Sequence, residues 1–356
     1  MLAGRRPQAK GRWLPSFAAP RGPVACAVMS TDLFLSASEL DASTLARAVP
    51  PSCLRGIDTG GPWQRDGRDR VLDCGPWTPR RPAVHLLPAF APLTPVSPAF
   101  RFEMSARVDG AWSPWVATVT LGLADFEPLP TAAGPLAAEL DELTVTQPPE
   151  AVRLRVRCRG VVPDVWLVSL SAASEPGEDF GVPPGAGAAV SVPPLSQVGE
   201  DAAIALRICS PTSVAMVLRY WGRPATAAAV AADAFHADTD RYGIWPAAVR
   251  AAARQGVAGY LLRFPDWTAA AWCLSRRIPI IASIQYASGE LRGAPMEATT
   301  GHLIVLTGYE DGVVLANDPA APTTVTVPRR YRRADLTRAW LERRGIGYVL
   351  FDPTRV

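Results

Sequence analysis

Hydrophobic and polar residues alternate along much of the first half of the chain. Apolar side chains take every second position in 100–108 and again in 152–158, where arginines separate them, and a largely apolar run follows at 165–170. A period of two is typical of a half-buried strand, and Asp109-Gly110 is a tight-turn signal. Short strands separated by turns predict an antiparallel, sandwich-like domain over residues 31–173.

Four other segments depart from this alternation. We expect disorder at 1–30, a short helix at 39–48 and a loop in the Gly-, Arg- and Asp-rich stretch 56–70. Residues 174–191 are rich in Gly, Pro and Ala, which predicts a linker and a domain boundary. The second domain then covers 192–356.

The second half of the chain changes to a helical period. Apolar residues recur at three- and four-residue spacing and predict helices at 210–221, 226–236, 246–255 and 267–276. Strand patterns follow at 278–284, in a hairpin over 302–318, at 323–327 and at 348–351, with a short helix capped by Asp335 and ending at Trp340. Helices followed by antiparallel strands indicate an α+β fold.

Cys209 stands where the first of these helices is expected to begin. Ser210 can cap this helix, and Pro211 suits its first turn, where a missing N–H costs nothing. A thiol at a helix N-terminus faces unpaired N–H groups and the positive end of the helix dipole, which lower its pKa and favour the thiolate. Cys209 is therefore a candidate nucleophile.

His302 and Asp318 lie at the open ends of the predicted hairpin. Asp311-Gly312 supplies its turn, so the residues at its two ends come together. Asp318 can then orient the His302 ring, which in turn can accept the thiol proton. Asn317 competes as the orienting group, but alternation along the strand turns it to the opposite face.

These residues carry a resemblance to a known family. The order Cys, His, Asp, the helix start Cys209-Ser210-Pro211-Thr212-Ser213 and the Gly301-His302 … Asn317-Asp318-Pro319 hairpin resemble the bacteriocin-processing (double-glycine-leader) cysteine peptidases, which are papain-like. The resemblance covers roughly 190–355 and is nearest to free-standing bacterial members with an extra N-terminal β-rich region. It implies a nucleophile helix packed on an antiparallel sheet, peptide or protein substrates, and no cofactor. It also implies that Gln197 helps to bind the oxyanion, beside the Cys209 backbone N–H.

Two other functions stay open beside the cysteine peptidase. The same three residues serve an amidase or acyl transferase acting on cell-wall peptides, and the sequence does not separate these reactions. The family usually has Gly directly after the nucleophile, whereas this chain has Ser210. That departure keeps a non-catalytic, peptide-binding relative as a third possibility.

Composition excludes several classes of partner. The net charge is only +3 and Lys10 is the only lysine, so we expect no nucleic-acid partner. The six cysteines include no C-x-x-C pair and lie near no His cluster, so we expect no metal. No run approaches the ~20 apolar residues of a membrane span, and the basic start lacks the apolar stretch of a signal peptide. We expect His236 on a solvated helix face. Without a signal-peptide pattern the sequence favours the cytoplasm, while the exterior or the cell envelope and the oligomeric state stay open.

Overall fold

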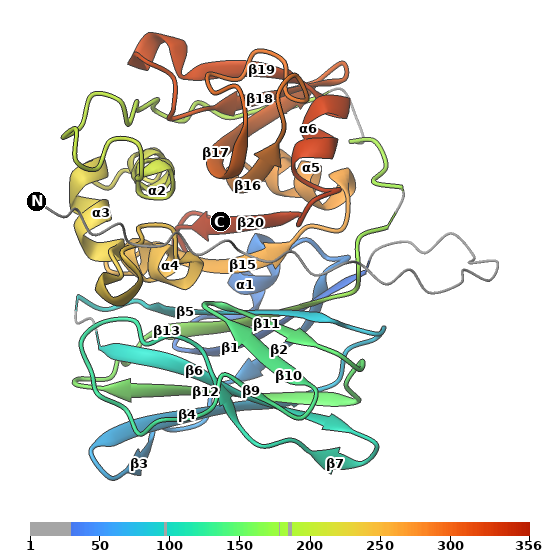
Figure 1. Ribbon diagram of the computed structural model, residues 1–356, viewed down its shortest axis with the longest axis vertical. Coiled ribbons are helices and arrows are strands. Elements are labelled where there is room, and N and C mark those ends of the chain that lie inside the picture. Colours follow the sequence, from blue (N-terminus) through green and yellow to red (C-terminus); the bar gives the residue numbers. More distant parts are fainter. Residues whose placement is uncertain (1–29, 96–97, 178, 184–186) are drawn as a thin grey trace, which may run out of the picture.

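The structure is a computed structural model that describes residues 30–95, 98–177, 179–183 and 187–356. The disorder expected at 1–30 therefore lies, except for Ser30, outside the described residues. The described part contains two sheets from the first half of the chain, stacked below a layered unit of helices and sheet (Figure 1).

The first sheet has seven strands in the order β2-β1-β13-β5-β11-β10-β9. They are β1 (Thr31–Ser38), β2 (Leu54–Thr59), β5 (His85–Pro92), β9 (Ala132–Ala133), β10 (Leu136–Glu139), β11 (Glu142–Val145) and β13 (Trp166–Ala173). Neighbouring strands are antiparallel except β1 and β2, which are parallel and joined through α1 (Ala42–Ala48). Asp41 caps α1 by accepting a hydrogen bond from the Thr44 N–H, which confirms the short helix.

The second sheet has six strands in the order β3-β4-β12-β6-β7, with β8 beside β6. They are β3 (Gln64–Asp66), β4 (Asp69–Trp77), β6 (Ala99–Val108), β7 (Ala111–Trp112), β8 (Val116–Ala117) and β12 (Ala151–Arg159). Phe90 of the first sheet packs edge-on against Phe100 of the second, with ring centroids 5.1 Å apart. The loop expected at 56–70 is wrong in part, because β2, β3 and the start of β4 occupy most of it and leave only 60–63 and 67–68 outside strands. β2 and β3 lie at the edges of their sheets and are largely exposed, so no apolar alternation marks them.

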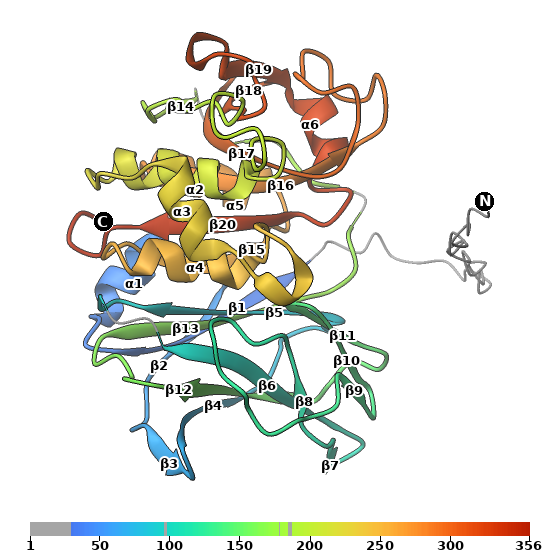
Figure 2. The ribbon, with the colours of Figure 1, turned by 60° about the vertical axis from the view of Figure 1, so that its left-hand side comes forward.

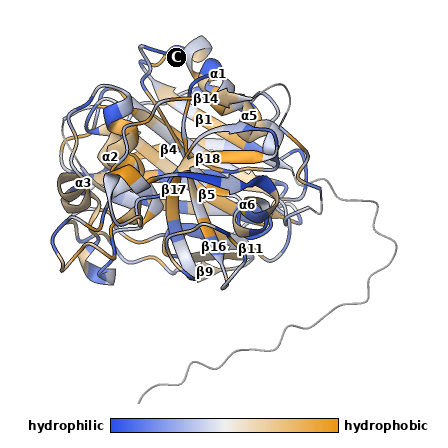
Figure 3. Cartoon of the chain, turned by 90° about the horizontal axis from the view of Figure 1, so that it is seen from above, coloured by the Kyte–Doolittle hydropathy of each residue, from blue (hydrophilic) through white to orange (hydrophobic). Residues whose placement is uncertain are grey.

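The third sheet belongs to the upper unit and has seven strands in the order β15-β20-β16-β17-β18-β19, with β14 beside β17. They are β14 (Ala188–Ala189), β15 (Ala258–Arg263), β16 (Ile280–Tyr286), β17 (Thr299–Glu310), β18 (Val313–Asn317), β19 (Pro328–Arg332) and β20 (Ile346–Phe351). The helices are α2 (Cys209–Tyr220), α3 (Ala227–Ala234), α4 (Trp245–Ala253), α5 (Trp267–Ser275) and α6 (Arg333–Ala339), with 3₁₀ turns η1 (Ala237–Thr239) and η2 (Thr324–Thr326). Figure 2 shows α2, α3 and α4 gathered beside β20, and Figure 3 shows hydrophobic residues on α2 and β18.

The predicted helices α2 to α5 and the β17–β18 hairpin are confirmed within one or two residues, apart from the longer start of β17. The strand expected at 323–327 is wrong: a Thr323 capping box starts the 3₁₀ turn η2, and the strand β19 follows it. Asp335 does not cap α6, which begins at Arg333 and holds Asp335 in its first turn. The buried strand β15 was missed, although its largely apolar run is visible in the sequence.

His236 is another correction. It is buried rather than solvated, because it follows the end of α3 and turns toward the lower sheets. Its ring nitrogens lie 2.8 Å from Thr239 Oγ1 and 2.9 Å from the carbonyl oxygen of Thr120. An imidazole with both nitrogens engaged is a structural link between the two halves of the chain.

One apolar core joins the first sheet to the upper unit. Leu33 and Leu87 of the first sheet belong to the same buried cluster as Val249 of α4 and Leu262 of β15. Hydrogen bonds cross this boundary as well, including one of 2.8 Å from the Tyr260 hydroxyl to the carbonyl of Ala48. The segment 174–191, expected as a linker, contributes the strand β14 to the third sheet.

Candidate active site

Cys209 is the first residue of α2. The N-cap is Ile208, which makes no side-chain cap, so the expected capping by Ser210 is wrong. Ser210 lies inside the first turn, buried, with its Oγ 3.1 Å from the Tyr348 hydroxyl. Ser213, one turn further on, donates to the carbonyl of Leu303 at 3.2 Å and ties α2 to β17. The start of α2 is thereby held against the strand that carries His302.

His302 and Asp318 meet at the open end of the β17–β18 hairpin. The strands are paired up to Val305 and Asn317, with the turn at Asp311-Gly312. His302 Nε2 lies 2.7 Å from Asp318 Oδ1, and both side chains are buried, with 2% and 0% of their surface exposed. The structure therefore brings the two residues together as the hairpin predicts. Asn317 instead donates to the carbonyl of Val192 at 2.9 Å.

Further donors hold the Asp318 carboxylate. Oδ1 also accepts the Ala320 N–H at 3.0 Å, and Oδ2 accepts the Tyr331 hydroxyl at 2.7 Å. Tyr331 lies on β19 and is fully buried. Sequence reasoning missed Tyr331 because it placed the strand after the hairpin at 323–327. A correct β18–β19 pairing was the signal that could have found it.

The electrostatics of these groups are mutually dependent. Burial raises the pKa of the Cys209 thiol. The hydrogen bond and charge of His302 lower this pKa by more than burial raises it, so the pKa lies below its ordinary 9.0. Burial lowers the pKa of His302, but Asp318 and Cys209 raise it, to about 10. By contrast, burial raises the pKa of Cys53 to about 12. Cys209 is thus placed to lose its proton more readily than an ordinary thiol, beside an imidazolium that stabilises the thiolate.

Gln197 lies beside the loop that follows β18. Its backbone N–H donates to the carbonyl of Pro319 at 2.9 Å, and Ser196 donates to the carbonyl of Ala321 at 2.6 Å. The Gln197 side chain is buried, and its Oε1 has no hydrogen-bond partner among the described residues. These contacts place Gln197 beside the segment that directly follows Asp318, and its oxyanion role stays a prediction.

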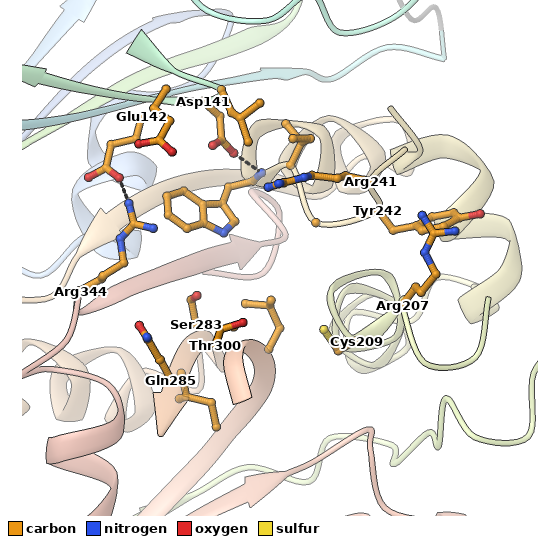
Figure 4. A pocket seen from close by; sticks show the side chains of 18 of the residues that line it. Asp141, Glu142, Arg207, Cys209, Arg241, Tyr242, Ser283, Gln285, Thr300 and Arg344 are labelled. Carbon is orange, nitrogen blue, oxygen red and sulfur yellow. Dashed lines mark hydrogen bonds and ion pairs between the residues drawn. The ribbon is translucent and has the colours of Figure 1, made fainter. Parts of the chain in front are cut away.

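A cavity of about 470 Å³ lies against Cys209. Leu206 and Arg207 line it beside Cys209, and β16 and β17 contribute Ser283, Gln285 and Thr300 on the side facing the start of α2 (Figure 4). Asp141 and Glu142 line it from the first sheet. The cavity gives a substrate a place beside the thiol.

The described part of the chain contains no cluster of three or more His, Cys, Asp or Glu side chains that could hold a metal ion. None of its helices is long and apolar enough to cross a membrane.

Comparison with known proteins finds a similarity to one family in the second half of the chain. Residues 190–348 match the model of the Peptidase_C39 like family, so the chain carries a C39-like domain with an N-terminal region before it. The family indicates a cysteine peptidase with a peptide substrate. The prediction of a β-rich region followed by an α+β domain of helices and sheet is confirmed. No curated protein matched the chain.

Proposed function

We propose that this protein is a cysteine peptidase of the papain-like type that hydrolyses peptide bonds with Cys209, His302 and Asp318. The observation that carries the proposal is the buried 2.7 Å contact between His302 and Asp318, beside a thiol whose pKa is lowered. The C39-like domain supports it, because that family indicates a cysteine peptidase. The proposed organisation, a β-rich region before the peptidase domain, resembles that of free-standing bacterial members of the family.

The proposed reaction has two halves. The Cys209 thiolate attacks the substrate carbonyl carbon, and the amide hydrogens of the Cys209 backbone and the Gln197 side chain stabilise the oxyanion. His302 then gives its proton to the leaving amine as the C–N bond breaks, leaving a thioester. His302 takes a proton from water as the water oxygen attacks the thioester carbon; the C–S bond then breaks, which releases the acid and regenerates the Cys209 thiolate. Asp318 keeps the ring oriented and stabilises its charged form.

The proposal also divides the chain into domains. Residues 192–356 form the peptidase domain, 174–191 connect it to the rest, and 31–173 form the β-rich domain. The substrate is a peptide or protein, and the proposed reaction uses the side chains named above, the Cys209 backbone N–H and water.

The test is hydrolysis of a peptide library, read by mass spectrometry, together with alkylation of Cys209 by iodoacetamide near neutral pH. We expect the wild type to cleave, Cys209→Ala to lose cleavage, and His302→Ala to slow alkylation. Cys158→Ala is the matched control, because Cys158 is also a free cysteine but is buried in the lower sheets. Alkylation of native Cys209 no faster than that of Cys158 would contradict the proposal and favour a non-catalytic relative.

An added amine nucleophile extends the test to the related chemistry. A thioester that passes its acyl group to the amine in preference to water indicates an acyl transferase. Cleavage confined to cell-wall peptides indicates an amidase.

A further inference from the structure

The cavity beside Cys209 has a wall from outside the matched family domain. The turn between β10 and β11 of the first sheet contributes Glu139, Leu140, Asp141 and Glu142 to its lining, whereas the family match begins at residue 190. Figure 4 shows Asp141 and Glu142 across the cavity from Cys209. The N-terminal region therefore helps to shape the space where a substrate would lie.

The backbone of this turn has an unusual residue in it. Glu139 pairs with Glu142, so Leu140 and Asp141 form a two-residue hairpin turn. Leu140 has φ 59°, a left-handed conformation that favours glycine, in a turn position where glycine is common. A bulky side chain kept in such a conformation costs free energy, and such strain concentrates at functional sites. Leu140 is half-buried and lines the cavity.

Contacts on both sides of the turn fix its position. Asp141 Oδ2 accepts the Trp245 N–H at 2.6 Å, at the first residue of α4. Glu142 forms an ion pair with Arg344 and lies 3.0 Å from His85 Nδ1. The Arg344 guanidinium in turn lies over the Trp245 ring, 5.0 Å from its centroid. The turn is therefore anchored to the C39-like domain.

An exposed apolar side chain lies on the Cys209 side of the same cavity. Leu206, three residues before Cys209, is 85% exposed and lines the cavity. Two cationic side chains of the lining are paired, since Arg207 lies 2.8 Å from Asp240 and Arg344 pairs with Glu142. An apolar group that entered here would remove Leu206 from water, which favours binding.

We infer that the β10–β11 turn is part of the substrate-binding site, and that Leu140 and Leu206 bind a large apolar side chain of a polypeptide substrate. This inference rests on the proposed function for the position of the scissile bond. It makes the N-terminal region a specificity element of the peptidase.

The experiment compares Leu140→Gly and Leu206→Ser with the wild type. Glycine suits the left-handed turn, and Leu206 is exposed, so both variants keep the fold. Leu123→Ser is the matched control, because Leu123 is 97% exposed and does not line the cavity. Cleavage of a random peptide library is measured with the wild type and each variant. Binding of the same library is measured with the same proteins carrying the additional substitution Cys209→Ala.

We expect the wild type to select a large apolar residue at one position relative to the scissile bond. This selectivity should fall about tenfold in each cavity variant and should be unchanged in Leu123→Ser. Alkylation of Cys209 by iodoacetamide, which is too small to need the turn, should be unchanged in all three.

The two readouts separate this inference from the proposed function. If the protein bound peptides with a large apolar residue but cleaved none, the proposed peptidase activity would be contradicted and the inferred binding site would be supported. Selectivity unchanged in both cavity variants, or no selection in either readout, would overturn the inference. So would slower alkylation in Leu140→Gly, which would show that the turn acts on the thiol and not on the substrate.

Discussion

Tyr331 donates a 2.7 Å hydrogen bond to the Asp318 carboxylate oxygen that His302 does not contact. The carboxylate is therefore held through both oxygens, with the Ala320 N–H as a further donor at 3.0 Å. Burial raises the pKa of Asp318, but the His302 charge and these donors lower it to below its ordinary value. A carboxylate fixed in this way holds the imidazole in one orientation.

We expect Tyr331→Phe to keep the fold and to lower kcat/KM for peptide hydrolysis by about tenfold, the value of one hydrogen bond to a charged group. Loss of this donor raises the pKa of Asp318. The acid limb of the kcat/KM profile should therefore move to higher pH, as hydrolysis rates measured across the pH range would show.

Tyr260→Phe is the control for this change. Tyr260 is also fully buried and donates one hydrogen bond, of 2.8 Å, to the carbonyl of Ala48, away from the site. It should lose stability without moving the acid limb. An equal shift in both variants would mean that Tyr331 acts through general stability alone.

The opposed pKa shifts of Cys209 and His302 predict a wide range of pH in which both are charged. The pKa of Cys209 is lowered below 9.0, while that of His302 is raised from 6.5 to about 10. The alkylation rate should therefore rise with an inflection below 9, and hydrolysis should fall only as His302 loses its proton near 10. In His302→Ala the alkylation inflection should move up. An inflection at or above 9 in the wild type would rule out this ion pair.

The sequence predicted those parts of the site that depend on local structure. The start of one predicted helix gave the position of Cys209. One predicted hairpin with an Asp-Gly turn gave the contact between His302 and Asp318. Tyr331 was not predicted, because its contact depends on how β19 pairs with β18. Leu140 was not predicted either, since it reaches the cavity only through the packing of the first sheet against the upper unit.

The proposed oxyanion role of Gln197 can be separated from activation of the thiol. We expect Gln197→Ala to lower kcat for peptide hydrolysis by about a hundredfold, as the loss of an oxyanion donor does. Alkylation by iodoacetamide should be unchanged, because substitution at its CH₂ carbon forms no oxyanion. Gln285→Ala, which removes an amide that lines the cavity beside Cys209, is the control and should lower kcat less. Equal losses of hydrolysis and alkylation would mean that Gln197 supports the structure of the site and does not bind the oxyanion.

The shared apolar core predicts that the two halves of the chain unfold together. Leu87 is fully buried in the cluster that joins the first sheet to α4 and β15, whereas Leu154 is fully buried between the two lower sheets. We expect Leu87→Ala and Leu154→Ala each to lower the free energy of unfolding by about 2–5 kcal/mol.

Urea unfolding can follow the two halves separately, by tryptophan fluorescence and by accessibility of the buried Cys158 in the lower sheets and Cys273 in the upper unit. All three signals should change at one urea concentration in the wild type, and at one lower concentration in each variant. The first sheet would then contribute to the core of the C39-like domain as well as to that of the β-rich region. If Cys158 became accessible in Leu154→Ala at urea concentrations that left Cys273 protected, the β-rich region would be an independent folding unit.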